Sequence, residues 1–197
     1  MTHNLISKNM NRKLGKGIGA FNLPHATTCP GKTAVCARVC YAGKAARIYK
    51  TARESRQRNY VLSLHPDFAK HMMAEVIQRG FDKVRLHESG DVYSQEYLEK
   101  LFEACQGCAG TQFLMYTKSF HLDWALKPDN LVVYWSTDSS TDLSTVPAGG
   151  VRAHLVLKGE PIPARHSTCV HSADKHYCGT ECQTCWIGED DVYFPQH

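Results

Sequence analysis

Lys83-Val-Arg-Leu-His-Glu-Ser-Gly-Asp91 is the stretch that decides the fold. Its first five residues predict a buried strand, because they are mostly apolar or β-favouring, and the polar residues up to Asp91 predict a loop. Ser94 then has the position and the side chain of a helix N-cap, with Leu98, Leu101 and Phe102 on the buried side of the helix it begins. The resulting unit is strand, loop, helix.

Similar units occur on both sides of this stretch. Helices are predicted from Lys44 to about Leu64 and from Pro66 to Gly80, the second with Phe68, Met72, Val76 and Ile77 on one apolar stripe. Further strands are predicted at 18–23, 111–117, 130–136 and 151–157, with a short helical stretch at 122–126. Strands that alternate with helices predict an α/β fold with a mainly parallel sheet and crossover helices. Both a partial, incomplete TIM-like barrel and a small open sheet satisfy this pattern.

The length of 197 residues suits one domain, because a single core serves up to roughly 250 residues. Residues 1–17 are polar and basic, and we expect a flexible arm there. No signal-peptide pattern or apolar run of about 18 residues is present, so we expect a cytoplasmic protein without membrane contact.

Charge is distributed unevenly along the chain. Residues 1–60 contain twelve Lys or Arg and the single acid Glu54, whereas the remainder carries an excess of acids. The basic residues within 38–58 are Arg38, Lys44, Arg47, Lys50, Arg53, Arg56 and Arg58. Such a face attracts phosphate, so nucleic acid is a candidate partner; the alternative is an ordinary solvated helix face.

Nine cysteines in a protein of the reducing cytosol favour metal ligation over disulfides. Seven of them form two groups, in cysteine-rich loops near the two ends of the chain: Cys29, Cys36 and Cys40, and then Cys169, Cys178, Cys182 and Cys185. Short spacings of this kind let one loop wrap a metal or a cluster. Cys105 and Cys108 have no matching second pair, and we expect them to be structural thiols.

Groups of three cysteines with mixed spacing favour a 4Fe–4S cluster, and zinc is the alternative cofactor. The sequence permits one or two clusters, and it permits a single cluster that draws ligands from both groups. Cys178, Cys182 and Cys185 also have the three-then-two spacing of radical S-adenosylmethionine enzymes. In those enzymes, however, the motif follows the first strand, whereas here it follows the last.

Polar residues gather where three predicted strands end. Arg85 and His87 should share one face of their strand, and Gly90 and Asp91 follow in the loop. The next two strand ends carry Tyr116, Thr117, Lys118 and Ser119, and then Ser136, Thr137 and Asp138. The carboxyl ends of parallel strands form the site in such folds, so His87, Asp91 and Lys118 are candidate catalytic residues; the alternative for each is a turn or cap residue.

The motifs Cys29-Pro-Gly, Cys36-Ala-Arg-Val-Cys-Tyr-Ala, the 84–94 stretch, Tyr116-Thr-Lys-Ser and Cys185-Trp occur in an order that resembles the phage "gene product 88" family. The resemblance spans roughly residues 18–186. It implies a virus-encoded iron–sulfur protein of the bacterial host cytosol, on a partial α/β barrel reminiscent of radical enzymes. It makes the seven grouped cysteines candidate ligands. It also makes Arg85, Ser89, Tyr116, Ser136 and Asp138 candidate cofactor-binding residues in the interior.

Three hypotheses follow. The first is a 4Fe–4S protein with redox or small-molecule chemistry at the cluster, where a small-molecule ligand is a further candidate partner. The second is a nucleic-acid-binding protein with a structural zinc or cluster. The third is a radical S-adenosylmethionine-like enzyme. The sequence leaves open whether the protein is an enzyme, and it leaves its oligomeric state open.

Overall fold

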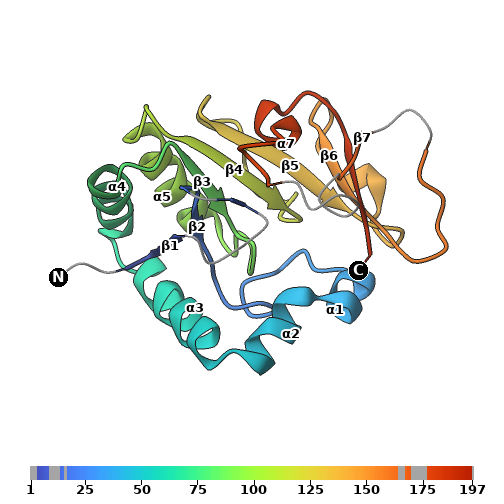
Figure 1. Cartoon of the computed structure of the whole chain (residues 1–197), viewed down its shortest axis with the longest axis horizontal. Coiled ribbons are helices and arrows are strands. Elements are labelled where there is room, and N and C mark those ends of the chain that lie inside the picture. Colours follow the sequence, from blue (N-terminus) through green and yellow to red (C-terminus); the bar gives the residue numbers. More distant parts are fainter. Residues whose placement is uncertain (1–3, 9–13, 16, 164–166, 170–176, 197) are drawn as a thin grey trace.

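The computed structural model describes residues 4–8, 14–15, 17–163, 167–169 and 177–196, and it shows an α/β fold around one eight-stranded sheet (Figure 1). The strands are β1 (Ile6–Lys8), β2 (Gly19–Phe21), β3 (Lys83–Leu86), β4 (Gln112–Thr117), β5 (Leu131–Thr137), β6 (Arg152–Val156), β7 (Ser167–Thr168) and β8 (Val192–Pro195). Their order is β1-β2-β3-β4-β5-β6-β8-β7. Only the β1–β2 pair is antiparallel among these strands. The predicted α/β class with a mainly parallel sheet is therefore confirmed, and the sheet stays open, with β1 and β7 at its edges.

The helices of the described ranges are α1 (Ala34–Val39), α2 (Tyr41–Ile48), α3 (Lys50–Ser63), α4 (Phe68–Arg79), α5 (Gln95–Gln106) and α7 (Thr184–Ile187), with a 3₁₀ turn at Leu143–Thr145. Helices α1 to α3 follow one another along the side of the molecule below the sheet in Figure 1, while α4 and α5 lie against the sheet. None of the helices in these ranges is long and apolar enough to cross a bilayer.

Local signals explain where the helices begin and end. Ser94 accepts a hydrogen bond from the backbone N–H of Tyr97 at the start of α5, as expected for an N-cap. Gly80 ends α4 in the left-handed conformation, with φ of 61°, which glycine adopts without a steric penalty. The single helix expected over 44–64 is instead divided at Tyr49, whose extended backbone separates α2 from α3.

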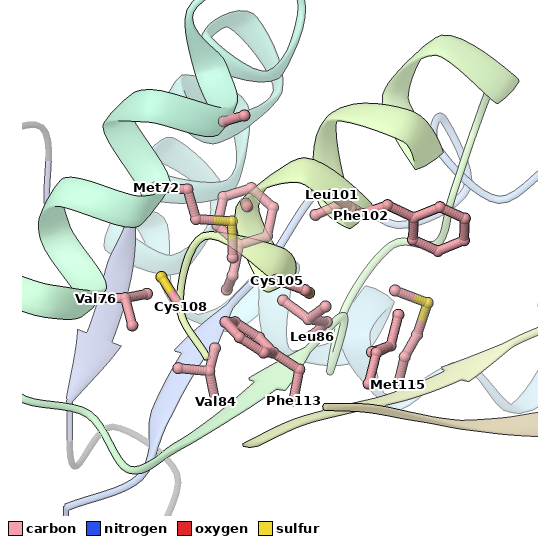
Figure 2. Close-up of a cluster of buried hydrophobic side chains, with 14 of the residues drawn as sticks. Met72, Val76, Val84, Leu86, Leu101, Phe102, Cys105, Cys108, Phe113 and Met115 are labelled. Atoms are coloured by element: carbon pink, nitrogen blue, oxygen red, sulfur yellow. The ribbon is translucent and has the colours of Figure 1, made fainter. Parts of the chain in front are cut away.

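The main core lies between the sheet and helices α4 and α5, on what we call the outer face of the sheet. Figure 2 shows Met72 and Val76 of α4 above Val84, Leu86 and Phe113 of β3 and β4. Cys105 and Cys108 are buried in the same cluster, as expected of structural thiols. The opposite side, the inner face, has a second cluster built on Leu114, Tyr134 and Trp186, with other apolar residues of the sheet and of the chain ends.

Three expectations about local structure are wrong. Ile77 does not belong to the buried stripe of α4, because its side chain is 65 % exposed. Residues 122–126 form turns instead of a helix, since so short a segment cannot sustain one and Gln95 hydrogen bonds with both backbone groups of Asp123. Part of the expected flexible arm is held in place, because Ile6–Lys8 pairs with β2 and both Leu5 and Ile6 are buried.

Candidate metal centre

The first cysteine group lies beyond the carboxyl end of β2. Cys36 is on α1, and Cys40 is at the junction of α1 and α2. The pKa of the Cys29 thiol is raised to about 12, first by burial and then by the nearby charges of Asp91, Cys36 and Cys40. The structure therefore brings the three predicted thiols together, close enough for their charges to interact.

Close packing fixes this loop over the strand ends. Thr33, the N-cap of α1, accepts a hydrogen bond from the backbone N–H of Cys36 and donates one of 2.6 Å to Asp138 Oδ2. A Cβ atom on Gly31 would lie 2.0 Å from the backbone oxygen of Lys118, so only glycine allows this approach. The loop is thus anchored to the ends of β4 and β5. Sequence reasoning missed Thr33, although a threonine three residues before Cys36 is a recognisable capping signal.

The buried ion pair of Lys118 and Asp138 lies next to this loop, which contacts it through Thr33. Lys118 Nζ is 2.8 Å from Asp138 Oδ2 and donates to the backbone oxygen of Ser136 at 3.0 Å. The two side chains are 8 % and 0 % exposed. Burial alone would raise the pKa of Asp138, but hydrogen bonds from Lys118, Thr33 and Ser140 lower it to about 2. Asp138 is therefore ionised at neutral pH, and its contact with Lys118 holds the end of β5 to the end of β4.

Asp91 completes this polar edge. Its carboxylate accepts hydrogen bonds from the Thr117 hydroxyl at 2.6 Å and from the backbone N–H groups of Val92 and Lys118 at 2.7 and 2.8 Å. Burial nevertheless raises its pKa to about 6. The structure therefore brings Asp91, Lys118 and Asp138 together at three neighbouring strand ends, beside the first cysteine group, while their catalytic and cofactor-binding roles stay predictions.

His87 does not face this site, and the expectation that Arg85 and His87 share one face is wrong. Strand β3 ends at Leu86, and His87 has a φ of 58°, which breaks the alternation of side chains along the strand. Its ring, 4 % exposed, lies in the core beside Phe21, and its Nε2 hydrogen bonds with the Tyr97 hydroxyl at 2.8 Å. Burial lowers the pKa of His87 to about 3, so the ring is neutral at physiological pH.

Ser89 and Ser136 also differ in their surroundings. Ser89 donates from its hydroxyl to the backbone oxygen of Leu23 at 2.8 Å and joins the loops that follow β2 and β3. Ser136 is paired with Ala153 on β6, and its backbone oxygen accepts from Lys118. Ser89 therefore has a clear structural role, because it links two loops, and the cofactor-binding role predicted for both serines stays a prediction.

The second cysteine group lies against the inner face of the sheet. The segment that carries it is held by hydrogen bonds from Lys83 Nζ to the backbone oxygen of Gly179 (3.1 Å) and from Gln112 Nε2 to that of Trp186 (2.7 Å). Cys178 and Cys182 form an isolated β-bridge, and the backbone N–H of Cys169 donates to Tyr193 of β8 at 2.8 Å. The first residues of β3 and β4, together with β8, thus position this group.

The thiol of Cys185 is affected by the charges of two other cysteines of the second group. Its pKa is raised to about 11, mainly by burial, and the charges of Cys169 and Cys178 raise it further. A hydrogen bond with Tyr116 and the charge of Arg85 act in the opposite direction. Cys182 is near enough for its charge to act, with that of Cys185, on Tyr134. The four predicted thiols are therefore gathered around one part of the inner face.

The donor chemistry of both groups fits an iron–sulfur cluster. Within the described ranges, no group of three or more His, Cys, Asp or Glu side chains is arranged to hold a metal ion. A cubane cluster needs a wider arrangement than one ion does, since each cysteine binds a different iron. A further sign of fit is Arg85 Nη1, a buried donor on the inner face that has no hydrogen-bond partner in the described structure.

The basic residues of 38–58 lie on α1, α2 and α3. Three of them stabilise the helices: Arg53 and Arg56 donate to backbone oxygens of α2, and Arg58 donates to that of Asn4. Sequence reasoning did not single out Ile48 and Tyr49, which are 71 % and 59 % exposed between these basic side chains. Basic and apolar groups therefore share one surface.

The comparisons with known proteins give a family and two relatives. The "Gene 88 protein" of Mycobacterium phage D29 and that of Mycobacterium phage L5 are each 30 % identical over 126 residues, which is 56 % of this chain and 52 % of the relative. The chain thus spans about half the length of the curated relatives it matches. No solved structure gives a significant match. The phage relatives support the bacteriophage origin expected from the motifs. Residues 3–189 match the family described as "Gene product 88", and the chain belongs to this family.

Proposed function

We propose that this chain is an iron–sulfur protein of the bacterial host cytosol, with 4Fe–4S clusters held on an open, partial barrel. The observation that carries the proposal is the gathering of seven thiols into two groups by one sheet. The charges of Cys36 and Cys40 act on the Cys29 thiol, and those of Cys169 and Cys178 act on the Cys185 thiol. This arrangement favours two separate sites over one cluster shared between the ends of the chain.

The environment of the thiols supports a metal ligand role. Burial raises the pKa values of Cys29 and Cys185 to about 12 and about 11, so neither is a reactive thiolate by itself. A bound cation deprotonates a coordinating thiol and offsets the repulsion between neighbouring sulfurs. Zinc would require four donors at about 2.3 Å from one ion, which is a tighter arrangement than a cluster needs.

The two cysteine groups differ in whether they can supply a thiol ligand to every iron of a cluster. Four cysteines can supply every iron of a cluster in the second group, whereas three cysteines leave one iron of a cluster in the first group without a thiol. An iron of this kind supplies Lewis-acid or redox chemistry to a small molecule. Asp91 and the Lys118–Asp138 pair lie beside this group, so they are the residues that would bind and orient such a ligand.

The test is anaerobic purification with measurement of iron and sulfide per chain, together with electron paramagnetic resonance. Cys36→Ser and Cys185→Ser should each remove the iron of one group and leave the other. Cys108→Ala is the matched control, because this thiol is buried in the apolar core and should change stability without changing iron content. Colourless protein that contains zinc alone would refute the proposal.

A second candidate function is nucleic-acid binding through α1 to α3. Exposed Ile48 and Tyr49 beside Arg47 and Lys50 combine an aromatic stacking surface with phosphate-binding charge, which is typical of single-strand binding. Binding of a labelled single-stranded oligonucleotide should weaken steeply with salt. Tyr49→Ala and a joint Arg47→Gln, Lys50→Gln variant should each weaken it, whereas Lys158→Gln, elsewhere on the surface, should not. An affinity for the oligonucleotide that does not change with salt concentration would refute this function.

Radical S-adenosylmethionine-like chemistry is the third candidate. Cys178, Cys182 and Cys185 have Cys169 beside them, which can close the fourth position of a cluster. The group with three thiols is instead the first one, and it follows β2, the first of the parallel strands. Cleavage of the cofactor by anaerobically reduced protein would support this candidate, and its loss in Cys36→Ser would assign it to the first group. Absence of turnover by cluster-loaded protein would reject it.

A further inference from the structure

Arg85, on β3, places a cation on the inner face of the sheet. Its guanidinium carbon lies 3.7 Å from the centroid of the Tyr116 ring, a cation–π contact that fixes the plane of the guanidinium. Nη1 is buried, and no described residue accepts a hydrogen bond from it. A buried, unpaired donor of this kind is costly, so a native structure normally supplies an acceptor for it.

The surroundings of Cys185 indicate what kind of acceptor Arg85 Nη1 would have. Tyr116 packs against the same inner-face cluster as Cys169, Cys178 and Cys185, and the charge of Arg85 acts on the Cys185 thiol. Tyr116 therefore links the guanidinium, which lies over its ring, to the cluster against which the second cysteine group packs. The Tyr116 ring makes a tilted contact with Tyr134 at 5.2 Å and an edge contact with Phe194 at 5.6 Å, and these two contacts hold it in place.

We infer that Arg85 and Tyr116 form a sulfur-binding pair for the cluster of the second cysteine group. Nη1 of Arg85 donates to a thiolate or sulfide sulfur of that cluster, and its charge offsets the negative charge that four thiolates bring to the site. Because reduction adds a further negative charge, this pair favours the reduced state. Arg85 and Tyr116 are positioning residues in this scheme. The inference rests on the proposed function, since it needs a cluster in the second group.

The geometry explains why an arginine is needed. A guanidinium keeps its charge at every physiological pH and holds several donors in one plane, so it can lie over the Tyr116 ring and still offer Nη1 to an acceptor at the edge of that plane. A lysine would retain the charge without this fork. Arg85→Met removes both charge and donors, whereas Arg85→Lys removes only the fork.

The experiment uses the full chain, purified anaerobically, with two readouts: the midpoint potential from a redox titration followed by electron paramagnetic resonance, and the rate of iron loss to a chelator. The signal that disappears in Cys185→Ser identifies the second group. Arg85→Met should shift its potential to more negative values and speed iron loss roughly tenfold, the loss expected for a hydrogen bond to a charged group. Arg85→Lys should restore most of the potential, and Tyr116→Phe should give a smaller shift.

Arg152→Met is the matched control, because Arg152 lies on β6 of the same sheet and pairs with Asp191 at 3.1 Å. It should leave potential and iron loss unchanged. If Arg85→Met leaves the midpoint potential unchanged and the rate of iron loss within twofold of wild type, this inference is wrong while the proposed function stands. The same holds if Arg85→Lys shifts the potential as far as Arg85→Met does. Wild-type protein without iron and sulfide in the second group would overturn the proposed function itself, and this is visible before any Arg85 variant is made.

Discussion

Replacing Asp138 with alanine should destabilise the chain by about 4 kcal/mol, because it leaves a buried ammonium group without its carboxylate and removes the hydrogen bond from Thr33. Lys118 Nζ lies 2.8 Å from Asp138 Oδ2, and the two side chains are almost completely buried. The same carboxylate accepts the hydroxyl hydrogen of Thr33 at 2.6 Å. One substitution therefore removes both an ion pair and the anchor of the loop that carries the first cysteine group.

The magnitude follows from what remains after the substitution. Breaking a buried pair by removing one partner typically costs about 3–5 kcal/mol. Lys118 keeps its hydrogen bond to the backbone oxygen of Ser136 at 3.0 Å, which moves the expected cost toward the lower limit. Loss of the Thr33 hydrogen bond adds about 1 kcal/mol. For a chain of this length, the corresponding fall in Tm is roughly 10 °C.

Urea denaturation at pH 7 measures the effect. Arg152→Ala is the control, because the Arg152–Asp191 pair is more exposed and should contribute less than about 1 kcal/mol. The double variant Lys118→Met, Asp138→Ala should be more stable than the sum of the single variants predicts, by about 2 kcal/mol, because both charges are then removed. A loss below about 1 kcal/mol in Asp138→Ala, or strict additivity in the double variant, would show that the pair is not the buried anchor described here.

Three further predictions follow from the same structure. The pKa of Asp138 is about 2 when folded and near 3.8 when unfolded, so the wild type should lose about 2 kcal/mol as pH falls from about 4 to about 2, and denaturation curves of Asp138→Asn should lack this acid limb. Gly31→Ala forces a Cβ to 2.0 Å from a backbone oxygen of the loop after β4; it should lower both Tm and iron content, whereas Gly110→Ala, with open space around it, should change neither. Met72→Ala should cost about 2–5 kcal/mol in urea denaturation because its side chain is fully buried, and Ile77→Ala on the same helix should stay within about 0.5 kcal/mol.

Much of the sheet was predictable from sequence because its central strands carry strong local signals. Strands β3 to β6 closely match the predicted ranges, and the N-cap at Ser94 and the C-terminal glycine at Gly80 end their helices as expected. Strands β1, β7 and β8 were missed, since each has only two to four residues and depends on pairing with a distant strand. Pairing of this kind leaves no periodicity in the sequence.

The candidate site was predictable in its composition and less so in its geometry. Parallel strands place their carboxyl ends at one edge, which is enough to expect Asp91, Lys118 and Asp138 near one another. The side to which His87 points depends on its single positive φ. Residues other than glycine rarely adopt a positive φ, so the sequence gives no signal for it. Similarly, the spacing of Cys178, Cys182 and Cys185 indicates a ligand loop, but it does not indicate which face of the sheet the loop covers.

The order of the strands explains how the two cysteine groups are positioned. The main core lies on the outer face, between the sheet and helices α4 and α5, and none of the seven grouped cysteines belongs to it. The first group is anchored to the ends of β4 and β5 by Gly31 and Thr33, and the second group is joined to β8, which lies between β6 and β7. The core and the strand ends together therefore determine where each cysteine group lies on the sheet.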